Sequence, residues 1–426
     1  MVAPFGKRRV GGYIWSITNQ NPPFPTKEIA EVKEQGLNSS QITLAHWMTK
    51  HYLADPLDCI KCQIGAKGEK ALTAPKNSIT TLLLIPYASQ VKLRAETLKL
   101  KLSTRTPRQQ GKLLVGSRSA VFAQLPNLKK IVIEEPENWN YKDERAPYYH
   151  AKDIAQKRAE LEGFKLELHY LTPRAEDFKN EKLNSPKINS TKVIDLNQEK
   201  SAMNFTFVSQ PLENLIRNRK YTIVYVSLRE LREKITEELR KLRVDRNITE
   251  IFGPEIFSLT GKSAEYVVWA DVDTLLNLPD FRVHEKILWT IGKLSQIARK
   301  TIYLQTSLPQ HQLFKDLDSG NLTNFYQREL QTRQEFSFPP FSTLIKLTFV
   351  SKSNIKTTLE AEKMSEKLAE FSPPFKVSPP YSPHTSTPGK VQLNIAIKAH
   401  RNDQLAKLLE VVDPQWKVEV DPETLL

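Results

Sequence analysis

The sequence predicts an α/β protein with several domains. Strand-like apolar segments alternate with helical segments in two stretches of the chain, which is the pattern of α/β layers. The 426 residues are enough for several hydrophobic cores. Hydrophobic residues make up 39% of the chain, and no apolar run approaches the roughly 20 residues of a membrane span.

The N-terminal region is expected to form a small β-rich unit followed by a helix. Val10–Ile17 is strand-like. Ser40–Leu53 repeats apolar residues at helical spacing, with Ser39 or Ser40 as the N-cap. Gly65–Ser78 is polar, so we expect a linker there.

The first α/β stretch follows this linker. Its expected strands are Thr81–Ile85, Leu113–Val115 and Ile131–Ile133, and its expected helix is Val91–Leu102. Short apolar runs of this kind favour a buried sheet. Residues 172–204 are polar with little periodicity and are expected to be a loose connection.

A second α/β stretch and a smaller α+β unit complete the chain. The second stretch is expected to hold strand Tyr221–Val226, helix Leu228–Leu242, strand Tyr266–Ala270, helix His284–Lys300 and strand Thr301–Thr306. After Pro339-Pro340 we expect strand Thr343–Val350, helix Ile355–Glu370, a proline-rich loop, strand Val391–Lys398, helix Asp403–Val412 and strand Trp416–Val420.

An acidic run ends the strand Ile131–Ile133. Glu134, Glu135 and Glu137 stand where P-loop ATPases carry the carboxylates that hold magnesium. Nothing upstream fits the phosphate-binding pattern G-x-x-x-x-G-K-[ST]. The stretch Thr260–Ser263 contains G-K-S, but Ile256 replaces the first glycine and a strand is expected to follow, so we do not expect it to bind phosphate.

This passage resembles primosomal protein N′, the replication-restart helicase family of bacteria. The family's motifs G-T-R-S-A, D-E-E-H and R-Y-H-A-R-D are similar to Gly116–Ala120, Glu134–Glu137 and Tyr149–Asp153. Its V-P-F-G-K, N-x-P-D-F-R, Y-P-P-F and V-D-V-D-P are similar, in the same order, to Val2–Arg8, Asn277–Arg282, Phe338–Phe341 and Val418–Pro422.

The resemblance implies two RecA-like helicase lobes, reduced here, between an N-terminal β-rich DNA-binding domain and a C-terminal α+β domain. We accordingly expect a truncated 3′ DNA-binding domain in residues 1–75. Residues 76–190 would be a remnant of lobe 1 without its P-loop, and residues 191–335 a remnant of lobe 2. Residues 336–426 would be the C-terminal domain.

Several parts of the family's ATP machinery are altered together. Tyr87 replaces an acidic residue, Leu171–Arg174 resembles S-A-T-P-S, and Gly292–Arg299 occupies the place of Q-V-A-G-R-A-G-R. Of the arginines in that last motif, Arg299 alone remains to neutralise a transferred phosphoryl group. We therefore interpret Glu134, Glu135 and Glu137 as relics or surface acids rather than metal ligands, and expect no catalytic residue. The family uses ATP and magnesium, but no cofactor is expected here.

Zinc is not expected either. Cys59 and Cys62 are the only cysteines, whereas structural zinc needs four ligands and the family's paired cysteines in lobe 2 are absent. The isolated His150 is interpreted as an ordinary hydrogen-bonded histidine.

Charge indicates a nucleic-acid partner. The chain has 62 basic and 48 acidic residues, a net charge of +14, and residues 1–120 hold 18 basic and 7 acidic residues. Cations follow phosphates and aromatic faces stack on bases. The expected DNA-binding residues are Phe5, Gly6, Lys7, Arg8, Arg9, Tyr13, Trp15, Lys27, Arg118, Trp139, Tyr141 and Lys142.

Two of these expectations have alternatives. Phe5, Tyr13 and Trp15 fit a small β core as well as a DNA surface. Trp139 and Tyr141 fit either an exposed stacking loop or packing against lobe 1. The family's 3′-end pocket uses residues that match Gly6 and Lys27, but one of its strands has no counterpart here, so we expect general DNA binding rather than 3′-end recognition.

The sequence thus predicts a cytoplasmic DNA-binding protein of replication or replication restart, without ATP-driven unwinding. One alternative is an active ATP-dependent 3′–5′ helicase, as in the family. The other is a non-enzymatic primosome scaffold. The expected partners are single-stranded or forked DNA, and single-strand-binding or primosome proteins, with no membrane.

Overall fold

The computed structural model describes residues 2–5, 8–11, 26, 28–31, 36–64, 79–103, 112–180, 188–198, 207–218, 220–241, 249–259, 261–370, 375–383, 388–399, 405, 408 and 411–426. The chain packs into two compact units. The first comprises Met1–Leu84, Gly111–Val132 and Lys142–Glu167. The second comprises Ile85–Gln110, Ile133–Tyr141 and Leu168–Leu426.

The N-terminal elements are a hairpin and two helices. Strand β1 (Val2–Phe5) pairs antiparallel with β2 (Arg8–Gly11), and α1 (Ser39–Tyr52) is followed by α2 (Pro56–Ile64). The predicted strand Val10–Ile17 begins within β2, and the rest of it lies outside the described residues, as does the linker Gly65–Ser78.

The cap of α1 differs from the prediction. Asn38 is the N-cap, rather than Ser39 or Ser40. Its Oδ1 accepts from the backbone N–H of Gln41 at 2.8 Å, and its own N–H donates to the Gln41 side chain at 3.0 Å. This reciprocal capping box places the helix start one residue earlier than predicted.

The first larger sheet has the strand order β4-β3-β5-β6. Its strands are β3 (Ile79–Leu84), β4 (Lys112–Gly116), β5 (Lys130–Glu134) and β6 (Lys165–His169). The connecting elements are η3 (Ala88–Gln90), α3 (Val91–Ser103), η4 (Arg118–Phe122), η5 (Trp139–Tyr141) and α4 (Ala151–Glu162). The prediction that Thr81–Ile85 and Ile131–Ile133 share one sheet is confirmed.

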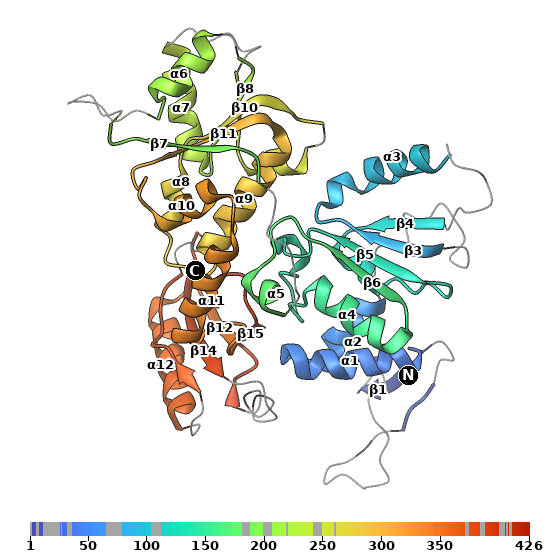
Figure 1. Ribbon diagram of the computed structural model, residues 1–426. Coiled ribbons are helices and arrows are strands. Elements are labelled where there is room, and N and C mark those ends of the chain that lie inside the picture. The colour runs from blue at the N-terminus through green and yellow to red at the C-terminus, as the bar shows by residue number, and fades with distance from the viewer. Residues whose placement is uncertain are drawn as a thin grey trace. The chain divides into compact units, whose positions relative to one another are not determined.

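The second sheet is parallel throughout and lies in the second unit (Figure 1), in the order β7-β11-β10-β8-β9. Its strands are β7 (Thr191–Asp195), β8 (Thr222–Tyr225), β9 (Thr249–Phe252), β10 (Ala264–Trp269) and β11 (Ala298–Thr306). The predicted grouping of β8, β10 and β11 is confirmed.

Two details of this region were predicted wrongly. Residues 172–204 contain α5 (Ala175–Asn180) and the edge strand β7, so they are not simply a loose connection. Residues 298–300 begin β11, so the helix expected at His284–Lys300 ends at Ile297.

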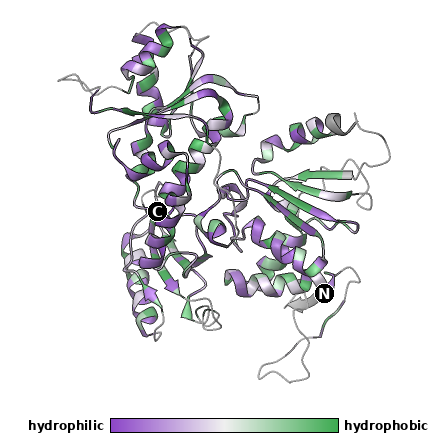
Figure 2. Cartoon of the chain, viewed as in Figure 1, coloured by the Kyte–Doolittle hydropathy of each residue, from purple (hydrophilic) through white to green (hydrophobic). Residues whose placement is uncertain are grey.

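Helices cover both faces of the second sheet. Its strands alternate their side chains between two separate cores, so Val267 and Trp269 belong to one core while Val268 and Ala270 belong to the other. The helices are α6 (Gln210–Arg217), α7 (Arg229–Lys241), η6 (Pro254–Ser258), α8 (Val272–Leu276), α9 (Val283–Ile297), α10 (Gln312–Ser319) and α11 (Thr323–Glu335). Figure 2 shows hydrophobic and hydrophilic residues alternating along these helices.

The C-terminal part is an antiparallel sheet with one helix packed on it. The order is β13-β14-β12-β15, with β12 (Thr343–Ser351), β13 (Lys376–Val377), β14 (Val391–Ala399) and β15 (Lys417–Val420). Helix α12 (Asn354–Glu370) contacts β12 and β14. The predicted helix Asp403–Val412 falls largely outside the described residues.

The sheets fall one in each of the four sequence segments 1–75, 76–190, 191–335 and 336–426, although the domain boundaries themselves stay predictions. None of the described helices is both long and apolar enough to cross a membrane.

Candidate functional site

The acidic turn after β5 lies in the second unit and is fixed by backbone hydrogen bonds. The N–H of Glu135 donates to the carbonyl of His169 at 2.8 Å, and the N–H of Asn138 donates to the carbonyl of Glu135 at 2.8 Å. Glu135 has a φ of 52°, in the left-handed region that a residue with a Cβ rarely adopts. The turn therefore holds its carboxylates in defined positions.

The chain's own cations and amides engage two of these carboxylates. Glu134 accepts from the guanidinium of Arg94 in α3. For Glu135, Oε1 lies 2.6 Å from Nζ of Lys293 in α9, and Oε2 accepts from Nδ2 of Asn138 at 3.2 Å. Lys293 is buried, and sequence reasoning did not anticipate its role. With both oxygens of Glu135 occupied, these residues do not fit a magnesium ion.

The third carboxylate is deeply buried. Oε1 of Glu137 accepts from the backbone N–H groups of Leu171 at 2.8 Å and Thr172 at 2.7 Å. Burial raises the pKa of Glu137 to about 7, although these hydrogen bonds oppose the shift. The segment that resembles S-A-T-P-S is thus tied directly to the acidic turn.

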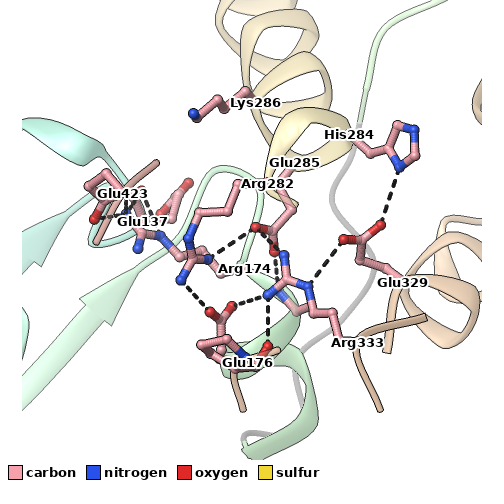
Figure 3. A network of polar contacts seen from close by, with 12 residues as sticks. Glu137, Arg174, Glu176, Arg282, His284, Glu285, Lys286, Glu329, Arg333 and Glu423 are labelled. Carbon is pink, nitrogen blue, oxygen red and sulfur yellow. Dashed lines mark hydrogen bonds and ion pairs between the residues drawn. The ribbon is translucent and has the colours of Figure 1, made fainter. Parts of the chain in front are cut away.

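A buried ionic network continues from this turn (Figure 3). The guanidinium of Arg174 donates to the carbonyl of Glu137 at 2.8 Å and lies 2.9 Å from a carboxylate oxygen of Glu423, beyond β15. The network joins α5, α9, α11 and the C-terminal segment through Arg174, Glu176, Arg282, His284, Glu285, Glu329, Arg333 and Glu423.

Arg333 is the most highly connected cation of this network. It is 1% exposed and lies 2.6 Å from Glu285, 2.9 Å from Glu176 and 3.1 Å from Glu329. Burial raises the pKa of Glu176, but the guanidinium groups of Arg282 and Arg333 outweigh it and hold that pKa well below its usual value. Burial also raises the pKa of Glu285, where it prevails over the same cations.

The loop after the acidic turn, expected to stack on bases, has Tyr141 and Lys142 buried and Trp139 half-buried. Tyr141 is 0% exposed and its hydroxyl donates to the carbonyl of Glu134 at 2.8 Å. Lys142 is also buried, with Nζ 5.7 Å from the ring centre of Tyr52. Trp139 packs on Trp289 of the second unit, with ring centres 4.2 Å apart. The packing alternative therefore holds for Trp139 and Tyr141, although Trp139 packs on Trp289 rather than on lobe 1.

Arg118 is engaged within the first unit. Its guanidinium lies 3.3 Å from the carboxylate of Asp143 and donates to the carbonyl of Lys142. Both partners stabilise its side chain on the protein, which does not favour the expected phosphate contact.

The expected N-terminal DNA-binding residues are only partly described. Phe5, Arg8 and Arg9 lie in the hairpin β1–β2, whose side chains are outside the described part. Gly6, Lys7, Tyr13, Trp15 and Lys27 lie outside the described residues altogether.

The structure also describes the two cysteines, the residues after Gly261 in the G-K-S stretch, and His150. Cys59 and Cys62 lie in α2, and burial raises the pKa of Cys59 to about 12. The described residues contain no group of metal-binding side chains. Strand β10 begins at Ala264, so a strand does follow the G-K-S stretch, as predicted. Lys262 of this stretch pairs with Glu250 at 2.7 Å. His150 is buried and caps α4 through its Nδ1, which confirms it as a hydrogen-bonded histidine.

Sequence reasoning also missed a cavity of about 650 Å³ in the second unit. It lies where β8 and β9 end and α7 begins, and Arg229, Arg232, Glu233, Thr236 and Arg240 of α7 line it with Gly253 and Glu255. Spacings of three and four residues put these α7 side chains on one helix face. Arg232 already pairs with Glu255, whereas the exposed Arg229 and Arg240 have no ion pair within the described residues. The repeated arginines of α7 were visible in the sequence. The cavity was not, because it forms only where α7 lies beside the ends of β8 and β9 in the fold.

Comparisons with known proteins show what the chain is similar to. Residues 1–64 match the family model of the PriA 3′ DNA-binding domain. The chain is 22% identical to the replication restart protein PriA of Bacillus subtilis, over 85% of this chain and 60% of that protein. It is 23% identical to PriA of Chlamydia pneumoniae, over 82% of this chain and 66% of that protein. The chain is PriA-like.

This PriA-like chain spans roughly three fifths to two thirds of the length of these relatives. Among solved structures, the helicase Lhr of Mycobacterium smegmatis bound to single-stranded DNA and AMP-PNP is similar with a TM-score of 0.37. That match is 11% identical and covers 66% of this chain and 50% of the other.

Proposed function

We propose that the PriA-like chain binds DNA in replication restart and works without ATP-driven unwinding. The match of residues 1–64 to a 3′ DNA-binding domain carries the proposal. The excess of 18 basic over 7 acidic residues in positions 1–120 supports it, because clustered cations attract the phosphate backbone.

The α7 cavity is the second proposed DNA contact. Ligands of open parallel sheets bind beyond the carboxyl ends of the strands, which is where this cavity opens. Guanidinium groups pair well with phosphate oxygens. Because Arg232 is engaged by Glu255, we assign Arg229 and Arg240 as the phosphate-contacting residues.

The acidic turn supports function without ATP. The turn's three carboxylates are held by Arg94, by Lys293 and by backbone N–H groups, and the sequence lacks a P-loop to cradle a triphosphate. Phosphoryl transfer depends on positioned cations around the phosphates, so the missing P-loop pattern and the engaged carboxylates together support function without ATP hydrolysis.

DNA titrations of the full chain test this proposal. Fluorescently labelled single-stranded and forked DNA should bind to the same extent with or without ATP at a constant magnesium concentration. The variant Arg229→Ala/Arg240→Ala should lower the slope of log affinity against log salt by about two, one for each lost phosphate contact. Lys234→Ala/Lys241→Ala removes two exposed charges from α7 that do not line the cavity, and should leave the slope nearly unchanged.

Three outcomes would contradict the proposal. DNA-stimulated ATP hydrolysis with strand separation would establish an active 3′–5′ helicase. Absence of DNA affinity combined with binding to a primosome or single-strand-binding protein would establish a scaffold. Equal salt slopes for the two double variants would remove the cavity from the DNA interface.

A further inference from the structure

Lys293 lies beside Glu135, in the acidic turn that resembles the magnesium-holding strand end of P-loop ATPases. Its ammonium lies 2.6 Å from Oε1 of Glu135 and is almost fully buried. The other oxygen, Oε2, accepts from Asn138. A buried ammonium is stable only when an opposite charge compensates it, so this pair is built into the fold rather than formed on its surface.

Aromatic rings complete the surroundings of the ammonium. Nζ of Lys293 lies 5.5 Å from the ring centre of Tyr87 and 5.9 Å from that of Trp289, one turn earlier in α9. The faces of such rings attract a cation. Tyr87 also replaces the acidic residue expected by family resemblance, which leaves Lys293 with an aromatic neighbour there instead of a second carboxylate.

The backbone directs Glu135 towards this cation. Its left-handed φ of 52° is kept by the hydrogen bonds from Glu135 to His169 and from Asn138 to Glu135. A non-glycine residue keeps such a conformation only where its surroundings enforce it. The conformation and the ion pair therefore support each other.

We propose that Lys293 is a built-in cation that takes the place of a divalent metal and holds the turn after β5 to α9 without nucleotide. The inference rests on the disagreement between these residues and a magnesium site. It rests on the same Lys293 contact as the proposed function without ATP, but not on DNA binding, so the Mn²⁺ test and the DNA titrations can fail separately.

The test removes the built-in cation and asks whether a metal enters. Lys293→Met keeps the apolar stem and deletes the charge. We expect the full-length variant to gain one Mn²⁺ site, measured by electron paramagnetic resonance titration. Its Mn²⁺ affinity should exceed that of the natural protein by about tenfold or more. A tenfold change corresponds to about 1.4 kcal/mol of binding free energy, which the loss of one repelling charge can supply. Adding Glu135→Gln should abolish the gain.

Lys300→Met is the matched control. Lys300 forms a lysine–glutamate pair of the same 2.6 Å length with Glu265, but on the surface. Deleting it should create no Mn²⁺ site, because water screens the freed carboxylate.

Three results would overturn the proposal. One is Mn²⁺ binding to the natural protein that disappears with Glu135→Gln. Another is a folded Lys293→Met variant without Glu135-dependent Mn²⁺ binding. If Lys293→Met does not fold in metal-free buffer, Mn²⁺ should restore its circular dichroism spectrum, and failure of Mn²⁺ to do so would equally overturn it.

Discussion

At the scale of single residues, Glu137 shows how burial turns a sequence relic into a structural group. Its Oε1 accepts from the backbone N–H groups of residues 171 and 172 in the segment preceding α5, and its Oε2 has no hydrogen-bond partner among the described residues. Its pKa of about 7 lies above the ordinary value of 4.5 because burial disfavours the charge.

This shift predicts a pH dependence of stability. Between pH 4.5 and 7 the folded state binds a proton that the unfolded state has lost, so the contribution of Glu137 to stability falls as pH rises through this window. Glu137→Gln keeps an oxygen acceptor but cannot ionise. We expect the difference in free energy of unfolding, variant minus natural protein, to increase between pH 5 and pH 7.5, by a few kcal/mol at most.

Chemical denaturation of both proteins across this range checks the prediction. Taking the difference between the two curves removes the titration of every other carboxyl group. Parallel curves would mean that Glu137 titrates normally in the folded protein.

At the scale of elements, Arg333 of α11 connects this helix to α5 and α9. It does so by ion pairs with Glu176 and Glu285, and it also pairs with Glu329. Replacing it with methionine leaves three buried carboxylates without their shared cation. Breaking a buried pair from one side typically destabilises by about 3–5 kcal/mol. We expect a loss of that size for Arg333→Met in thermal and denaturant unfolding.

Arg217→Met is the control for this prediction. Arg217 pairs with Glu213 one turn away in α6 but is 65% exposed, so its loss should stay below about 1 kcal/mol. Similar losses for the two variants would show that the network is solvated and not structural.

Strands β8, β10 and β11 of the parallel sheet were predictable because each contains a short apolar run that packs into the cores on both faces. The edge strand β7 was not, since Thr191, Lys192 and Asp195 leave it polar and only its pairing with β11 makes it a strand. The cap of α1 was ambiguous for a related reason: Asn38, Ser39 and Ser40 are all good N-caps, and the side chain of Gln41 decides among them.

The candidate site was predictable only as a list of residue types. The acidic run and the altered motifs were visible in the sequence, but the pairing of Glu135 with Lys293 joins residues 158 positions apart. Tyr141 looked like a stacking residue because its sequence neighbours are polar, whereas the fold buries it completely. Such distant contacts have no local signal.

At the scale of the whole molecule, charge and packing are divided between different regions. The ionic network and the Lys293 pair are built from residues beyond position 134, while most of the excess positive charge lies in the first 120 residues. A protein that binds DNA without an ATP cycle must obtain its affinity from such fixed charges, and its binding should then depend steeply on salt.

The N-terminal cluster gives the last prediction. Replacing Lys7, Arg8 and Arg9 by alanine in the full chain should weaken binding to every DNA sequence similarly, because phosphate contacts carry no sequence information. The slope of log affinity against log salt should flatten by roughly two to three units. The control replaces three exposed lysines of the C-terminal part by alanine, namely Lys352, Lys356 and Lys367, and should keep the slope. A folded triple variant with unchanged affinity and slope would remove the N-terminal cluster from the interface and leave the α7 cavity as the candidate DNA contact.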